Sequence, residues 1–220
     1  MLEVAVLASG RGSNLQALSD YAADLDHGIS LRCVISDRAD AGALERARAA
    51  AIPAHFVDPR AHADRAEFDA AVDALLVEHG VTLIVLAGFM RVLGSALVQK
   101  WHGSMLNIHP ALLPKYRGLH THQRALDARD AEHGASVHFV TETLDDGPVI
   151  LQAVVPVERS DDAAALAARV QAVEHRVYPF VVGLFAQGRI ALTADGVNLD
   201  GAPLTAPLRV TVETDLACVA

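Results

Sequence analysis

The chain has 220 residues, of which 52% are hydrophobic and 20% are charged, and its formal charge is −9. This acidic balance argues against a broad basic surface for nucleic acid. The longest apolar stretch covers residues 81–90 and is shorter than the ~20 residues that cross a bilayer, so we expect no membrane segment.

The two cysteines, Cys33 and Cys218, form no metal-type spacing and no disulfide framework. They therefore favour a reducing, cytoplasmic location. Residues 1–10 enter an apolar run without a preceding basic region, which argues against a signal peptide. The length is typical of a single domain with a substantial core.

The first 110 residues alternate short apolar runs with longer amphipathic segments. Strands are expected at residues 2–8, 29–36, 54–57, 81–89 and 104–109, and helices at 13–23, 41–50, 64–80 and 95–101. The first helix is expected to begin at an N-cap near Ser13 or Asn14. This βαβα order predicts a Rossmann-like α/β fold, with a mostly parallel sheet and helices on both faces.

The pattern changes in the second half of the chain. Two strands are expected at residues 134–141 and 149–157, followed by a long helix over 161–188 that contains Pro179. The tail carries short strand-like pieces with Asp-Gly turns, and we expect it to extend the sheet in an antiparallel manner. The sequence thus predicts one domain over 1–220, with parts at 1–110, 111–190 and 191–220.

The segment "LASGRGSNLQAL" places Gly10 and Gly12 between the first strand and the first helix. Glycines let a ligand approach the backbone, and free N–H groups at a helix N-terminus favour an anion. Side chains that could assist are those of Arg11, Ser13 and Asn14. The turn lacks the third glycine of a dinucleotide fingerprint, so a monophosphate fits better. A tight turn without ligand remains the alternative.

Asn107 and His109 lie two residues apart at the end of an expected strand, so their side chains share one side. Ligands bind at the carboxyl ends of strands in open α/β sheets. An amide and an imidazolium aimed at one oxygen would stabilise a developing oxyanion, and one such donor contributes about 3 kcal/mol. Histidine can also move protons near neutral pH. The alternative is a buried histidine with a satisfied hydrogen bond.

Asp145, on the loop between two expected strands, is the natural third member of this group. A carboxylate beside His109 would favour the charged imidazolium and fix its orientation. The alternative for Asp145 is a turn-forming residue. Five more histidines crowd the region, namely His102, His120, His122, His133 and His138. Their spacing matches no familiar metal motif, so no metal is expected, and we assign His120 and His122 supporting or structural roles.

A family resemblance rests on five motifs that occur in order between residues 2 and 190. They are "GRGSNLQAL", "LAGFMRVL", "LNIHPALLPKYRGLHTH", "EHGASVHFVTETLDDGPVILQ" and "RVQAVEHRVYP". The chain resembles the phosphoribosylglycinamide formyltransferases, the folate-dependent enzymes of purine synthesis. The resemblance implies the formyltransferase fold. It also implies transfer of a formyl group from 10-formyltetrahydrofolate, as cosubstrate, to the amine of 5′-phosphoribosylglycinamide.

The same resemblance implies the residues of the site. The catalytic trio would be Asn107, His109 and Asp145. The phosphoribosylglycinamide would bind to Arg11, Gly12, Ser13, Asn14, Gln171 and Glu174. The folate would bind to Arg65, Met90, Arg91, Val92, Leu93, Asn107, Val140, Thr141, Glu142, Thr143, Leu144 and Asp145. Residues 1–110 would then be the phosphate-binding half and 111–190 the folate and catalytic half. A cis Leu113–Pro114 bond is also implied.

Other functions remain as alternatives. Hydrolysis of 10-formyltetrahydrofolate would need no phosphoribosyl pocket, so the glycine turn argues against it. Formylation of initiator tRNA would need an RNA-binding part, which a short acidic chain does not suggest. A non-catalytic phosphosugar-binding module would leave Asn107, His109 and Asp145 without a joint purpose. We expect small-molecule partners and either a monomer or a homodimer.

Overall fold

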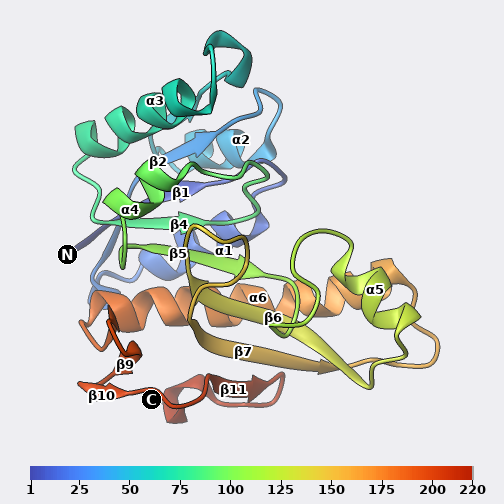
Figure 1. Ribbon diagram of the computed structural model, residues 1–220. Helices are drawn as coiled ribbons and strands as arrows, with labels where there is room; N and C mark the ends of the chain where they lie inside the picture. Colours follow the sequence, from blue (N-terminus) through green and yellow to red (C-terminus); the bar gives the residue numbers. More distant parts are fainter. Residues whose placement is uncertain (220) are drawn as a thin grey trace. The chain divides into compact units, whose positions relative to one another are not determined.

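The structure is a computed structural model and describes residues 1–219. The chain divides into two compact units, which are described separately. The first unit contains residues 1–107 and 140–142, and the second contains 108–139 and the chain from 143 onward. Figure 1 shows the elements of both, with labels where there is room.

The first unit is a parallel sheet with helices. Its strands are β1 (Leu2–Leu7), β2 (Ile29–Ser36), β3 (Ala54–Phe56), β4 (Leu83–Leu86) and the first part of β5 (Met105–His109). They lie in the order β5-β4-β1-β2-β3, and every neighbouring pair is parallel. The helices are α1 (Ser13–Ala22), α2 (Gly42–Ala49), α3 (Arg65–Glu78) and α4 (Ser95–Lys100), with short 3-10 turns at Leu25–His27 and Pro59–Ala61. The predicted parallel α/β architecture is confirmed for this unit.

The core of the first unit follows from the alternation of side chains along its strands. Ala5 and Leu7 of β1 belong to the buried cluster that contains Phe68 and Val72 of α3 and Leu97 of α4. Val4 and Val6, which alternate with Ala5 and Leu7 along β1, are also completely buried. Their side chains point to the opposite face of the sheet. A strand that is apolar on both faces therefore stands between two layers of helix. Each large side chain buried in this way stabilises the fold by about 1.5–3 kcal/mol.

Among the boundaries in the first unit that differ from the sequence-based predictions, two have a clear cause in the backbone. The strand expected at 81–89 ends at Leu86, and Gly88 then adopts φ 74° while its carbonyl accepts a hydrogen bond from the N–H of Ser9. The N-cap of α1 is Gly12, with φ 75° and no side-chain cap, rather than Ser13 or Asn14. The helix still begins at Ser13, and the left-handed backbone that glycine permits places its N-cap at Gly12.

The second unit joins strands of both directions to one long helix. Its larger sheet contains β6 (Glu132–Phe139), β7 (Val149–Pro156) and β11 (Leu208–Thr211). Strand β7 is antiparallel to β6 and parallel to β11. Helix α6 (Ala163–Ala186) packs against β6 and β7, and the short helix α5 (Thr121–Asp127) packs against α6 (Figure 1). No helix was predicted at α5, so the sequence interpretation was wrong there.

Helix α6 shows why its sequence forms a buried helix. The side chain of Asp162 caps its N-terminus by accepting a hydrogen bond from the N–H of Ala165 at 2.7 Å. Apolar residues then recur every three or four positions and are buried, at Leu166, Val170, Val173, Val177 and Val181. This spacing produces one continuous apolar face.

The tail forms strands, as predicted, but only part of it extends a larger sheet. Strands β8 (Ile190–Thr193), β9 (Gly196–Leu199) and β10 (Ala202–Pro203) make a separate antiparallel sheet, whereas β11 pairs with β7 in parallel. A 3-10 turn follows at Leu216–Cys218. Within residues 1–219, no helix is long and apolar enough to span a membrane.

Candidate active site

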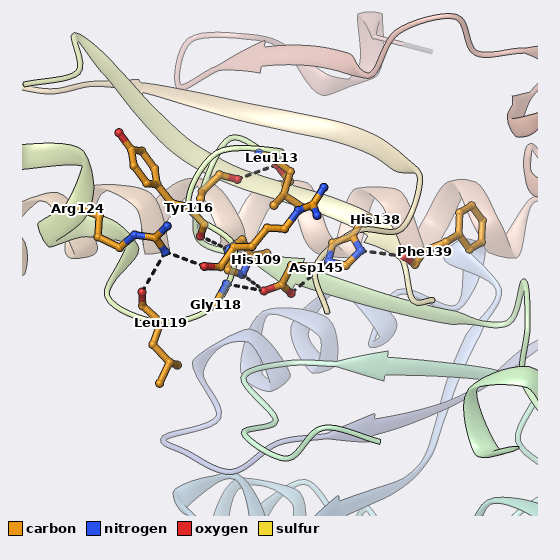
Figure 2. Close-up of polar contacts among 12 residues, drawn as sticks. His109, Leu113, Tyr116, Gly118, Leu119, Arg124, His138, Phe139 and Asp145 are labelled. Atoms are coloured by element: carbon orange, nitrogen blue, oxygen red, sulfur yellow. Dashed lines mark hydrogen bonds and ion pairs between the residues drawn. The ribbon is translucent and has the colours of Figure 1, made fainter. Parts of the chain in front are cut away.

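His109 and Asp145 come together in the second unit, although they lie far apart in the sequence. His109 is the last residue of β5, and Asp145 lies on the loop between β6 and β7. The Nδ1 atom of His109 lies 3.4 Å from Oδ2 of Asp145, and both side chains are 7% exposed (Figure 2). The imidazole and the carboxylate are thus close enough to interact directly, and both are shielded from water.

The backbone around Asp145 holds its carboxylate in place. Asp145 adopts φ 50°, the left-handed region that aspartate tolerates better than most residues. Its Oδ2 atom also accepts a hydrogen bond from the N–H of Gly118 at 2.9 Å. One carboxylate oxygen thus faces both the imidazole and a backbone donor, which fixes the direction of the charge.

His138 is the second imidazole beside this carboxylate. Its Nε2 atom lies 3.9 Å from Oδ1 of Asp145, and its Nδ1 atom lies 2.8 Å from the carbonyl oxygen of Phe139 (Figure 2). The side chain is only 2% exposed, and burial lowers the pKa of His138. A neutral His138 with its proton on Nδ1 satisfies the Phe139 carbonyl.

The other nitrogen of His109 is already engaged. Its Nε2 atom lies 2.9 Å from the carbonyl oxygen of Tyr116, and a carbonyl can only accept a hydrogen bond. The Nε2–H group of His109 therefore donates a hydrogen bond to this carbonyl. Nδ1, which faces Asp145, is the nitrogen available for proton transfer. Asn107 lies two residues earlier on the same strand and is half-buried.

The glycine turn of the first unit is closely packed. A Cβ atom at Gly12 would lie 2.7 Å from the Cα atom of Ala43, so α2 leaves no room for a side chain. The carbonyl of Arg11 accepts a hydrogen bond from Nε of Arg46 at 2.9 Å. Ser13 and Asn14 are the first two residues of α1. The glycine turn therefore lies at the N-terminus of α1, and its assignment as an anion site stays a prediction.

Several of the expected folate-binding residues cluster in the first unit. The guanidinium of Arg91 lies 4.8 Å above the ring of Phe68, and the N–H of Gly94 donates to Oδ2 of Asp69 at 2.6 Å. Arg65 lies at the start of α3. Burial raises the pKa of Asp69, although the N–H of Gly94 and the charges of Arg65 and Arg91 oppose this shift. Met90 and Val92 are exposed between them in the sequence, and Leu93 is buried.

The remaining predicted residues lie on the 140–145 segment and on α6. Within the first unit, the N–H of Val140 donates to the carbonyl of Met105 at 2.9 Å, and Glu142 accepts from Gln99 at 2.8 Å. Within the second unit, Leu144 is 53% exposed. Gln171 and Glu174 are three residues apart on α6 and therefore lie on the same side of the helix. Thr141 and Thr143 complete the predicted segment.

Comparison with known proteins identifies the family of the chain. Residues 2–182 match the formyl transferase family. The chain is 48% identical to phosphoribosylglycinamide formyltransferase of Escherichia coli over 200 residues, covering 91% of this chain and 94% of that protein. It is 44% identical over 193 residues to the human trifunctional purine biosynthetic protein adenosine-3, of which it spans 19%. The phosphoribosylglycinamide formyltransferase structure from Coxiella burnetii superposes with a TM-score of 0.90, at 46% identity over 96% of this chain and 98% of that one.

The chain belongs to the formyl transferase family. The resemblance inferred from the five motifs is thereby confirmed, and so is the formyltransferase fold. The cis Leu113–Pro114 bond that the resemblance implied is also present in this family member. Among residues 1–219, no group of three or more histidine, cysteine, aspartate or glutamate side chains is arranged to hold a metal.

One buried residue of this formyl transferase fold was not anticipated from the sequence. Ser136 on β6 accepts a hydrogen bond from the N–H of Leu113 at 3.0 Å and donates one to the carbonyl of Ala111 at 2.7 Å. Nε2 of Gln152 also donates to the Leu113 carbonyl at 2.8 Å. These bonds fix the chain immediately after His109.

Two further histidines form a pair behind the site. Nδ1 of His122 on α5 lies 3.1 Å from Nε2 of His133 on β6. His133 is 1% exposed, and burial, with the neighbouring His122 and His109, lowers its pKa to about 4. Burial also lowers the pKa of His122. The supporting role predicted for His122 fits this position, because the pair joins the short helix to the sheet.

From the His122–His133 pair we predict that the free energy of unfolding falls in mild acid. The folded-state pKa of His133 is below its unfolded value, so the stabilisation is complete above about pH 6.5 and decreases as the pH falls toward 4. Between pH 7 and pH 5 the free energy of unfolding should fall by about 2 kcal/mol from this residue alone. Urea titrations at the two pH values measure the change.

The matched variants are His133→Gln, which removes the titrating ring, and His102→Gln at an exposed position. The first should flatten the dependence on pH and the second should leave it as in the parent protein. An equal loss of stability in all three proteins would show that His133 is not the responsible group.

Proposed function

We propose that the chain transfers the formyl group of 10-formyltetrahydrofolate to the amine of 5′-phosphoribosylglycinamide, producing 5′-phosphoribosyl-N-formylglycinamide and tetrahydrofolate in purine biosynthesis. The observation that carries the proposal is the buried contact of 3.4 Å between His109 and Asp145. It lies within a fold whose relatives, at 48% and 46% identity, are named phosphoribosylglycinamide formyltransferases.

The mechanism that we propose requires no covalent intermediate with the protein. The amine nitrogen forms a bond to the formyl carbon, and the carbonyl oxygen takes up the negative charge. Asn107 and protonated Nδ1 of His109 would stabilise that oxygen, and Asp145 would keep the imidazole charged. The bond from the formyl carbon to the folate nitrogen then breaks. The proton lost by the amine balances the one gained by the leaving nitrogen, through His109, Asp145 and water.

The binding residues are proposed from the family resemblance and their positions. Backbone N–H groups at the Gly12 turn would hold the phosphate, with side chains of Arg11, Ser13 and Asn14. Gln171 and Glu174, on one side of α6, would hold the glycinamide end. The folate would contact Arg65, residues 90–93 and residues 140–145. Holding both substrates in a reactive geometry can contribute about 7–11 kcal/mol to the lowering of the barrier.

The division of the chain also remains a proposal. We propose a single formyltransferase domain over 1–220, with a phosphate-binding part at 1–110, a folate and catalytic part at 111–190 and a tail at 191–220. The partners that we propose are the two small molecules, with 10-formyltetrahydrofolate as cosubstrate. A cytoplasmic location stays a prediction from the two cysteines, which are both free.

One assay tests the function. The protein is mixed with 10-formyltetrahydrofolate, and the folate absorbance is followed with and without phosphoribosylglycinamide. Loss that depends on the amine is the expected result, with the formylated product identified by mass spectrometry. Loss without the amine would instead identify a hydrolase, and no loss under either condition would leave a phosphosugar-binding module.

A further inference from the structure

The backbone carbonyl of Tyr116 accepts the hydrogen bond from Nε2 of His109, and Tyr116 is in a strained conformation. Tyr116 adopts φ 56°, in the left-handed region. For a bulky residue this conformation costs about 1–2 kcal/mol, so contacts elsewhere must hold it. The loop around Tyr116 therefore depends on side-chain contacts for the position of this carbonyl.

Asp130 supplies the principal contacts. Its Oδ2 atom accepts a hydrogen bond from the hydroxyl of Tyr116 at 2.7 Å, and both of its carboxylate oxygens lie 2.9 Å from Nζ of Lys115. The Asp130 side chain is 17% exposed, and these two partners lower its pKa, so it is ionised at neutral pH. One carboxylate thus binds two consecutive residues of the loop.

The backbone fixes Asp130 independently of that loop. Its N–H donates to the carbonyl of Ala125 in α5 at 3.1 Å. The guanidinium of Arg124, on the same helix, lies 5.1 Å from the centre of the Tyr116 ring and donates to the carbonyl of Arg117 at 2.6 Å. The end of α5 is therefore a support against which the Tyr116 loop is held. Figure 2 shows the Arg124 and Tyr116 side of this arrangement, next to His109.

The position of the Tyr116 carbonyl determines which tautomer His109 adopts. At 2.9 Å the carbonyl requires a proton on Nε2. In the neutral imidazole the lone pair is then on Nδ1, 3.4 Å from Asp145. If the carbonyl moved away, the neutral ring could instead place its proton on Nδ1, and the proton-accepting nitrogen would face the wrong side.

We propose that Asp130 is a positioning residue for His109. Through Lys115 and Tyr116 it holds the Tyr116 carbonyl on Nε2 of His109 and so keeps Nδ1 as the nitrogen that exchanges protons. The consequence for turnover rests on the proposed formyl transfer, whereas the consequence for the tautomer does not.

The test uses Asp130→Asn, which preserves the shape of the side chain and removes its charge. We expect kcat to fall about 10- to 100-fold, as for a misplaced catalytic group, with KM for both substrates changed less than about threefold. Nitrogen NMR of the labelled protein should show the neutral His109 ring mainly protonated on Nε2 in the parent and as a tautomer mixture in the variant.

Further variants separate positioning from general destabilisation. Tyr116→Phe removes one of the two partners and should lower kcat severalfold. In combination with Asp130→Asn it should add little, because both changes act on one contact. The control is Asp200→Asn, which breaks an exposed ion pair of 2.7 Å with Arg189 and should leave both kcat and the His109 spectrum unchanged.

The possible results are distinguishable. An active parent whose Asp130→Asn variant keeps both its kcat and its His109 spectrum would overturn the inference. If Asp130→Asn does not fold, an unchanged kcat and spectrum in Tyr116→Phe would overturn it instead. A parent that transfers no formyl group would contradict the proposed function, while the tautomer measurement would still decide the role of Asp130.

Discussion

Replacement of His109 by alanine is expected to lower kcat for formyl transfer by about 10²- to 10⁴-fold. The side chain is 7% exposed, and its Nδ1 atom faces Asp145, so neither water nor a neighbouring side chain can take over both of its roles. Binding of phosphoribosylglycinamide should persist, because the glycine turn that we assign to the phosphate belongs to the first unit. Steady-state kinetics measure the first effect, and calorimetry measures the second.

Asp145→Asn is the companion change. Asparagine tolerates φ near 50° and can still accept the Gly118 N–H, so the loop should keep its conformation while the charge disappears. We expect a loss of kcat of a similar order, with the circular dichroism spectrum unchanged. His102→Ala, at an exposed position, serves as the control. Near-normal turnover in either site variant would contradict the proposed roles.

The strands of the first unit could be predicted closely because their sequences leave little choice. Strand β2 has the predicted bounds, Ile29–Ser36, and β1 ends one residue before the predicted boundary. Short runs that are apolar on both faces can be buried only in a parallel sheet between helices. The end of β4 was missed by three residues, because Ala87 and Phe89 continue the apolar run after the backbone has turned at Gly88.

Helix α5 could not be predicted from its own sequence. It has seven residues, and an isolated helix of that length is unstable in water. Its N-cap residue, His120, has φ 59° and makes no side-chain cap. The helix is instead stabilised by its packing against α6, with Thr121 and Ala125 buried. Such a contact between distant segments is not visible in a local pattern.

The candidate site was predictable where residue type and strand position act together. The contact between His109 and Asp145 could be anticipated from a histidine at the end of a strand and an aspartate on a loop between two others. The role of Asn107 stays a prediction. The contact between His109 and the Tyr116 carbonyl was not predictable, since a backbone carbonyl carries no signature in the sequence. The hydrogen bond from the Tyr116 hydroxyl to Asp130 was not predictable either. It joins residues 14 apart, and the left-handed residue of this loop is a tyrosine rather than a glycine.

Gly134 is expected to be the most sensitive backbone position among those that do not touch substrates. It lies within β6, opposite Val154 of β7, and a Cβ atom built on it would lie 1.9 Å from the carbonyl oxygen of Ala153. The same atom would lie 2.9 Å from Cδ2 of Leu112. A glycine inside a strand often marks such a close approach of another backbone.

Gly134→Ala should therefore lower the free energy of unfolding by at least about 4 kcal/mol, the range of severe core disruptions. The clash is with backbone, so β6 and β7 must separate and lose part of their hydrogen bonding, whereas a flexible side chain could move aside. For a chain of this length the melting temperature should fall by about 8–16 °C. Thermal unfolding followed by circular dichroism measures the effect.

Gly10→Ala is the matched control, since no atom lies within 4 Å of its added Cβ and its φ is not in the left-handed region. Its melting temperature should stay within a few degrees of the parent. If the Gly134→Ala protein were as stable as the Gly10→Ala protein, β6 and β7 could move apart without lowering the free energy of unfolding, and the prediction would be wrong. Because β6 carries His133, Ser136 and His138 and leads into the Asp145 loop, loss of this strand pair should also remove activity. A glycine at position 134 is thus required for the approach of the two strands that precede and follow the Asp145 loop.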